Sequence, residues 1–135
     1  MNVSSEHDEQ VMVIQYCDLM ARRNPDYGLI FAIPNGGQRN VITAALLKAE
    51  GVKKGVPDLF LPVPKGIYCG LFIEMKRRKG GRVSKEQVSW LANLMSRGYK
   101  CVVARGFDEA REAIDIYMEG DQWSERDRAQ EQPEQ

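Results

Sequence analysis

Three charged side chains in the middle of the chain have the types and spacing that metal-assisted hydrolysis requires. Glu74 and Lys76 lie two residues apart at the end of an apolar segment, residues 68–76, that is typical of a β-strand. Side chains two residues apart in a strand point to the same face of the sheet, so this acid and this base should project together. Asp58 opens the preceding apolar segment, residues 58–63. A hairpin between the two segments would place its carboxylate beside that of Glu74.

Two carboxylates within a few ångströms of each other repel unless a cation lies between them. Hard oxygen ligands with no His or Cys nearby favour Mg²⁺ or Mn²⁺ over Zn²⁺. A neighbouring lysine can position or deprotonate a water, or offset the charge that builds up when a phosphodiester is hydrolysed. The alternative is that Glu74 and Lys76 form a structural ion pair in an unrelated α/β domain.

Hydrophobic periodicity and turn residues predict the elements that hold these side chains. The pattern predicts helices over residues 5–23, 38–50, 84–98 and 107–118, and strands over residues 29–33, 58–63, 68–76 and 100–104. This order predicts an α/β fold with a mixed central β-sheet flanked by helices. The last strand follows the Glu74 strand through a helix, so the two should be parallel.

Length and composition favour one domain over residues 1–119 and a polar, mobile tail over residues 120–135. No apolar run reaches the ~20 residues that span a membrane, and the polar first ten residues predict no secretory signal. The three cysteines lie far apart without a C-x-x-C motif, and His7 is the one histidine, which we interpret as simply exposed. A disulfide framework and a zinc site are therefore disfavoured, and we expect a cytoplasmic protein.

The formal net charge of zero hides an uneven distribution of charge. Nineteen basic residues balance nineteen acidic ones over the whole chain, but residues 76–105 hold nine basic residues and one acid, Glu86, which leaves this segment at +8. A glycine-containing basic loop next to the proposed metal site suits contact with a phosphate backbone. Few aromatic residues interleave with these cations, so contact with duplex backbone is favoured over stacking of single-stranded bases.

The order and spacing of these motifs resemble the PD-(D/E)xK nuclease superfamily. The matching residues are Gly55-Val56-Pro57-Asp58-Leu59, Ile73-Glu74-Met75-Lys76, Ser84 and Gln87. More narrowly, the chain resembles the VRR-NUC (virus-type replication-repair nuclease) family, over a stretch from about residue 5 to about residue 117. The resemblance implies a restriction-endonuclease-like core and a divalent-metal-dependent endonuclease that cuts DNA of a particular structure. The Val-Arg-Arg sequence behind the family's name is not intact, since Val103-Ala104-Arg105 occupies that strand end.

The resemblance also implies a role for each matching residue. Asp58 and Glu74 would be metal ligands, the backbone carbonyl of Met75 would complete part of the metal shell, and Lys76 would be the catalytic lysine.

An acid on the first helix normally joins such a site. We predict Glu9 for this role, as a further metal ligand, with Glu6 as the alternative. Gln87 would face the active site, or would serve as the third residue of a capping box begun by Ser84; one side chain can do both.

Small stand-alone members of the family, as in phages, resemble homodimeric Holliday-junction resolvases. The resemblance therefore implies a homodimer that acts on branched double-stranded DNA in DNA repair, in a phage-infected host cell if the chain is phage-encoded. A flap or nicking nuclease, or a DNA-binding module without activity, is the alternative. The residues that we expect to contact DNA are Arg77, Arg78, Lys79, Arg82, Lys85 and Asn35.

Overall fold

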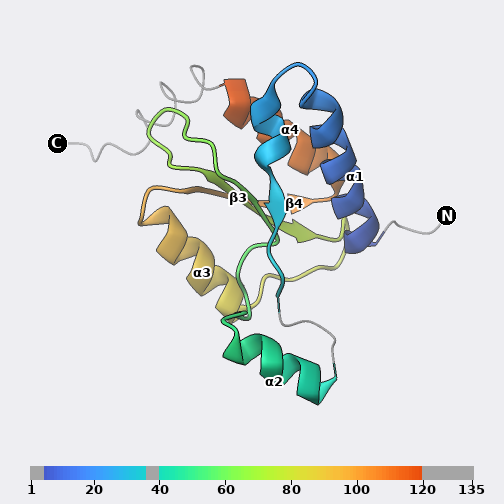
Figure 1. The fold of residues 1–135 in the computed structure, drawn as a ribbon, viewed down its shortest axis with the longest axis vertical. Helices are drawn as coiled ribbons and strands as arrows, with labels where there is room; N and C mark the ends of the chain where they lie inside the picture. Colours follow the sequence, from blue (N-terminus) through green and yellow to red (C-terminus); the bar gives the residue numbers. More distant parts are fainter. Residues whose placement is uncertain (1–4, 36–39, 120–135) are drawn as a thin grey trace.

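The computed structural model describes residues 5–35 and 40–119 (Figure 1). Along the chain the elements are α1 (Glu6–Met20), the 3₁₀ helix η1 (Pro25–Leu29), β1 (Phe31–Ala32), α2 (Val41–Ala49), β2 (Leu59–Leu61), β3 (Leu71–Lys76), α3 (Lys85–Met95), β4 (Lys100–Arg105) and α4 (Phe107–Glu119). The predicted α/β class and the order of elements are confirmed.

The strands form one mixed sheet in the order β1-β2-β3-β4. β2 pairs with both β1 and β3 in antiparallel fashion, whereas β3 and β4 are parallel and are connected through α3. Leu59 lies opposite Ile73 in the hairpin. One residue further along this register, Asp58 faces Glu74, as the hairpin prediction requires.

The two faces of the sheet are covered by different helices. Figure 1 shows α1 and α4 together on one side and α3 on the other. Val13 of α1 and Ile114 of α4 are fully buried in the core with Leu71, Ile73 and Met75 of β3. Because side chains alternate along a strand, the even-numbered residues of β3 face the opposite side, toward α3. Glu74 and Lys76 are therefore held on the α3 side, on a strand that is buried at all six positions.

Local sequence signals fix where the helices begin. The Ser5 side chain accepts a hydrogen bond from the Asp8 amide at 3.0 Å and so caps α1. Ser84 and Gln87 form a complete capping box at the start of α3. Each of these bonds satisfies a backbone donor that the first turn of a helix leaves without an internal partner.

Several elements are shorter than predicted: β2 and β3 cover only part of residues 58–63 and 68–76, α1 ends at Met20, and α3 ends at Met95. Residues 29–33 contribute only the two-residue strand β1, because Asn24 accepts a hydrogen bond from the Asp26 amide and starts the 3₁₀ helix η1 through Leu29. The second helix begins at Val41 and is capped by Asn40. Residues 36–39, the first four residues and the predicted tail lie outside the described residues. Within the described part, no helix is long and apolar enough to cross a membrane.

Candidate active site

The carboxylate of Asp58 is held by the neighbouring strand. Its Oδ2 accepts a hydrogen bond from the backbone amide of Met75 at 2.7 Å, and its Oδ1 accepts one from the Asn35 side chain at 3.3 Å. The Met75 amide sits between the two catalytic candidates of β3 in the chain. Asp58 is thus brought to the Glu74 face of the sheet by β3 itself. Asn35 thus orients this carboxylate, and its predicted contact with DNA stays a prediction.

Glu74 is 2% exposed, and its two carboxylate oxygens differ in their contacts. Its Oε1 accepts a hydrogen bond from Gln87 Nε2 at 2.8 Å and lies 3.5 Å from Lys76 Nζ. Its Oε2 is buried and has no hydrogen-bond partner among the described residues. An unsatisfied buried acceptor costs about 1–3 kcal/mol, so this oxygen is a natural ligand atom for a bound group.

The pKa values of the two acids show how poorly the site tolerates two negative charges. Burial and the negative charge of Asp58 together raise the pKa of Glu74 to about 8, and the charge of Lys76 opposes both. Burial also raises the pKa of Asp58, against the hydrogen bond from the Met75 amide. A divalent cation between the carboxylates would remove this conflict, because an opposite charge favours the ionised form of an acid.

The donor atoms fit a hard cation. Asp58 and Glu74 offer carboxylate oxygens, and the backbone carbonyl of Met75 follows Glu74 directly in the chain. Among the described residues, no three His, Cys, Asp or Glu side chains gather around one point. The protein would thus contribute few ligands and leave the rest of the shell to water and substrate phosphate, which is the habit of Mg²⁺.

Glu9 does not join these residues. It is fully buried, its Oε1 accepts from Arg78 Nε at 2.8 Å, and its Oε2 accepts from the Phe107 amide at 2.7 Å. Phe107 is the first residue of α4, so Glu9 caps that helix and ties the basic loop after β3 to it. Burial acts to raise the pKa of Glu9, but these two hydrogen bonds outweigh it and leave the pKa below its ordinary value. Both oxygens are already hydrogen-bonded within the fold, which argues against the predicted role of Glu9 as a metal ligand.

Glu6 is the acid of α1 whose charge acts on the site. It is half-buried, and its negative charge raises the pKa of Asp58. Helical geometry puts Glu6 and Glu9 on neighbouring positions of one face, so the sequence pattern could not separate them. His7 between them is exposed.

Gln87 fulfils both roles that the sequence left open. Its Oε1 accepts from the Ser84 amide at 2.8 Å and its backbone amide donates to Ser84 Oγ at 3.2 Å, which completes the capping box. Its remaining amide group, Nε2, donates to Glu74. The start of α3 and the orientation of Glu74 are therefore set by one side chain.

The predicted DNA-contacting residues fall into two groups. Arg78 is engaged with Glu9 and lies 3.9 Å from Asp108. Gly106, at φ +92°, makes room for it, since an added Cβ would come within 2.8 Å of the Arg78 side chain. Arg78 is itself 47% exposed. The other predicted cations are exposed as well: Arg77, Lys79, Arg82 and Lys85.

Arg105 is a structural residue of this region whose role the sequence did not reveal. Its Nη1 donates to the Gly81 carbonyl at 2.8 Å, across 24 residues of chain. With the Arg78–Glu9 pair, this contact fixes the basic loop, residues 77–82, against the ends of β4 and α4. Its place in the altered Val103-Ala104-Arg105 strand end was the one available signal.

A mixed sheet that presents an aspartate, a glutamate and a lysine from two adjacent strands is the arrangement of a PD-(D/E)xK nuclease core. Comparison with known proteins agrees: the family model of the VRR-NUC domain matches residues 6–108. The chain belongs to the VRR-NUC family, and its function is of the nuclease type, in DNA processing.

A solved structure described as a VRR_NUC domain protein has the same fold, with a TM-score of 0.75 and 28% sequence identity. The similarity covers 89% of this chain and 93% of that one. The search of curated proteins found no match.

The assignment of Glu9 to the fold makes a prediction about stability. Glu9→Ala removes the cap of α4 and leaves Arg78 without its buried partner, so we expect a loss of about 1–3 kcal/mol in the free energy of unfolding at pH 7. Because the folded-state pKa of Glu9 lies below its ordinary value of 4.5, the stabilisation is present above that pH and is lost as the pH falls. Urea unfolding of wild type and variant at several pH values measures both effects. The control is Glu6→Ala, which removes an acid that repels Asp58 and should cause no such loss. Equal losses for the two variants would contradict the assignment.

The open oxygen of Glu74 makes a second prediction. Mg²⁺ or Mn²⁺ should raise the melting temperature of the wild type. A metal concentration one hundred times the dissociation constant adds about 2.7 kcal/mol to the free energy of unfolding. Since the raised pKa of Glu74 destabilises the metal-free fold as the pH rises from its ordinary 4.5 toward about 8, the gain should be larger at pH 8 than at pH 6. Thermal unfolding with and without metal measures it. Glu74→Gln should abolish the gain and Asp108→Asn, an exposed acid outside the site, should retain it; a wild type indifferent to metal would argue against the metal site.

Proposed function

We propose that this protein is a divalent-metal-dependent endonuclease that hydrolyses phosphodiester bonds in branched double-stranded DNA, with Mg²⁺ or Mn²⁺ as its cofactor. The observation that carries the proposal is the buried Glu74 oxygen that has no hydrogen-bond partner among the described residues, beside Asp58 and with Lys76 3.5 Å from the other Glu74 oxygen. Asp58, Glu74 and the Met75 carbonyl would hold the metal, and Glu6 would complete the acidic side of the site from α1. A bound divalent cation would supply the charge that activates water and neutralises phosphate oxygens.

The remaining residues of the site orient its reactive groups. Lys76 is buried and keeps its ammonium group on the substrate side of β3, where it can orient a nucleophilic water or donate to the phosphate in the transition state. Gln87 fixes the rotation of Glu74, and Asn35 fixes that of Asp58. Such preorganisation lowers the barrier because the groups need no rearrangement when charge develops.

The surroundings of the site suit DNA backbone. Arg77, Lys79 and Arg82 are exposed on a loop that is fixed by Arg78 and Arg105, so their charges are presented from a restrained segment. Contacts of this kind to phosphates position a duplex without reading its bases. Selection by the shape of the DNA follows, which is what a nuclease for branch points needs.

A four-way junction has approximate two-fold symmetry and needs two cuts, which a two-fold symmetric dimer supplies. We therefore include Holliday-junction resolution by a homodimer in the proposal. α2 supports it, because this helix buries none of its residues and exposes Val41, Ile42 and Leu46 by 85%, 75% and 61%. An exposed apolar patch of this kind marks a protein interaction site, and a second copy of the chain is the occupant that the substrate's symmetry favours.

The catalytic role of Lys76 can be tested by junction cleavage. Lys76→Ala should reduce the cleavage rate in Mg²⁺ or Mn²⁺ by about 100-fold or more, as loss of a transition-state donor does. Binding should change little because Lys76 is buried. Gel assays on labelled four-way junction, flap and linear duplex measure rate and preference, with Arg22→Ala, an exposed cation beyond α1, as control.

Each other outcome identifies an alternative. Equal rates for wild type and Lys76→Ala would refute the catalytic assignment. Salt-dependent binding by a wild type that never cuts would indicate a DNA-binding module without activity. Faster cleavage of flaps than of junctions would identify a flap nuclease.

The dimer makes a separate prediction. Wild type should elute with about twice the chain mass of 15.3 kDa by light scattering, and the double variant Ile42→Asp, Leu46→Asp should be a monomer. The variant should nick junctions while losing paired cuts, because its active site is unchanged. Met95→Asp on α3, where Met95 is 53% exposed, is the matched control. A monomeric wild type would overturn the dimer and leave the nuclease proposal in place.

A further inference from the structure

Trp90 lies one helical turn after Gln87 on α3, and it is half-buried. Residues three apart on a helix are neighbours on its surface, so the indole lies next to the side chain that contacts Glu74. Three surface hollows meet at Trp90. The first, of about 430 Å³, extends along α3 toward Arg97. The second, of about 350 Å³, extends toward Val52 and Val56, and the third, of about 300 Å³, lies between Lys54 and Lys85. The indole is therefore accessible from several sides rather than packed into the core.

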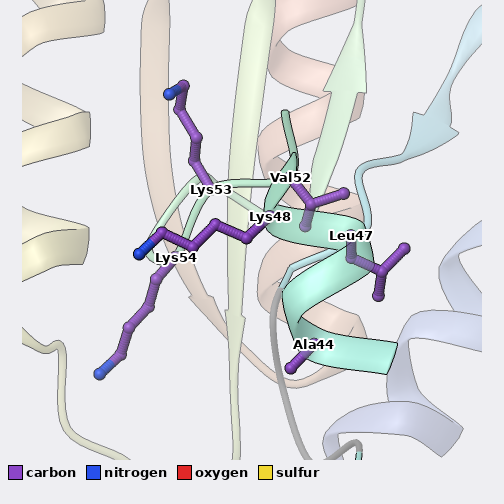
Figure 2. A pocket seen from close by; sticks show the side chains of 6 residues that line it. All are labelled: Ala44, Leu47, Lys48, Val52, Lys53 and Lys54. Carbon is purple, nitrogen blue, oxygen red and sulfur yellow. The ribbon is translucent and has the colours of Figure 1, made fainter. Parts of the chain in front are cut away.

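Lysines surround this tryptophan. Lys54 and Lys85 line one of its hollows and Lys53 lines another, and all three are exposed. Figure 2 shows Lys53 and Lys54, with Lys48, extending their amino groups away from Leu47 and Val52 at the end of α2. We call Trp90 with Lys53, Lys54 and Lys85 the Trp90 patch.

Two acids lie at the edge of the patch. Glu50 lines the hollow shared with Lys53, and Glu86 lies 3.9 Å from Lys54 Nζ with both side chains well exposed. An exposed ion pair at this distance is weak and screened by salt, so it does not prevent Lys54 from binding a phosphate. The three lysines against these two acids leave the patch positive.

The backbone ties the patch to the active site. Gly55, at φ +92°, runs against the first turn of α3, where an added Cβ would lie 2.7 Å from Glu86 Cβ and 3.0 Å from the Gln87 amide. The same loop carries Lys53 and Lys54 just before this contact and Asp58 just after it. The basic loop, residues 77–82, follows Lys76 and is fixed to α1 through Arg78 and Glu9 and to β4 through Arg105. Cationic segments thus precede Asp58 and follow Lys76 in the chain, and the Trp90 patch is the one with an aromatic side chain at its centre.

We propose that the Trp90 patch binds an unpaired DNA strand beside the cleavage site, with a base stacked on the indole and phosphates on the lysines. The base faces of a duplex are covered by their neighbours, so an aromatic side chain can stack only on an unpaired or displaced base. An aromatic residue within a cationic groove is the usual composition of a single-strand site. The inference rests on the proposed function in that this strand is the part of the branched DNA that leads away from the cut bond.

The proposal differs from the expectation from sequence that stacking of single-stranded bases is disfavoured. Trp90 lies among the cations of residues 76–105, but Lys53 and Lys54 reach it only through the fold, so their contribution is invisible in the local pattern.

The test uses the full chain with Trp123→Phe, which leaves Trp90 as its single tryptophan. Oligothymidylate of about 12 nucleotides, within the usual site size for a single strand, should quench the Trp90 emission in EDTA, where no cleavage occurs. Blunt duplex DNA should quench it much less. Unchanged emission at saturating oligothymidylate would overturn the proposal.

Variants then separate stacking from charge, with anisotropy of labelled oligothymidylate as the measurement. Trp90→Leu should weaken binding by about 5- to 100-fold, the usual loss for one stacked base, while Trp90→Phe should retain most of it. Lys53→Ala with Lys54→Ala should lower the slope of log affinity against log salt by about 1.4, from two lost phosphate contacts to a single strand. The control pair is Arg22→Ala with Arg23→Ala, two exposed cations beyond the far end of α1, about 22 Å of helix from Glu6.

Thermal unfolding of each variant shows whether it is folded. If Trp90→Leu does not fold, the Trp90→Phe variant still tests the proposal. Trp90→Leu binding as tightly as wild type would overturn the proposal. Because these measurements need neither metal nor cleavage, they remain valid if the nuclease proposal fails. Junction cleavage with normal oligothymidylate binding by Trp90→Leu would refute the Trp90 patch alone.

Discussion

The burial of two carboxylates side by side is the constraint on which this structure depends. Asp58 and Glu74 come from paired strands, and burial raises the pKa of both. A fold that holds such a pair must supply positive charge and hydrogen-bond donors at the same place, and it does so with Lys76, the Met75 amide and Gln87. Even so, one oxygen of Glu74 stays unsatisfied by the described residues. The energy that this arrangement costs the metal-free protein is what makes it a favourable place for a cation.

A second buried acid organises the surroundings of the first two. Glu9 caps α4 and binds Arg78, so one carboxylate joins α1, α4 and the loop after β3. Three residues away on the same helix, Glu6 remains available and acts on Asp58 through its charge. The difference has a physical cause. Glu9 faces the start of α4 and accepts hydrogen bonds from the Phe107 amide and the Arg78 guanidinium, whereas Glu6, the first residue of α1, does not. A single α1 face thus serves both the fold and the site.

The features that could be predicted from sequence are those fixed by local interactions. Alternation along residues 71–76, the capping box of Ser84 and Gln87, and the hairpin that brings Asp58 to Glu74 all arise between residues close in the chain. The features that could not be predicted depend on contacts across the fold. Glu9 meets Phe107 and Asn35 meets Asp58 only after the sheet and helices have packed. Which of two acids on one helix face is buried is decided by what packs against it, and no spacing rule contains that information.

The formal net charge of zero does not show how the acids and cations are distributed in the fold. Some acids of this chain form ion pairs that hold the fold together, as Glu9 does with Arg78. Others, such as Asp58 and Glu74, lie at the centre of the site. The exposed cations that precede Asp58 and follow Lys76 in the chain are then left to face a polyanion. They differ in mobility and chemistry: the basic loop is restrained by two long-range contacts, whereas the lysines near Trp90 stand on an open surface beside an aromatic ring. In the proposed function, a uniform duplex would use only one of these surfaces. A branch point, which offers duplex on one side and unpaired strand on the other, would use both at once. In this proposal, branched DNA would therefore be selected without any base being read.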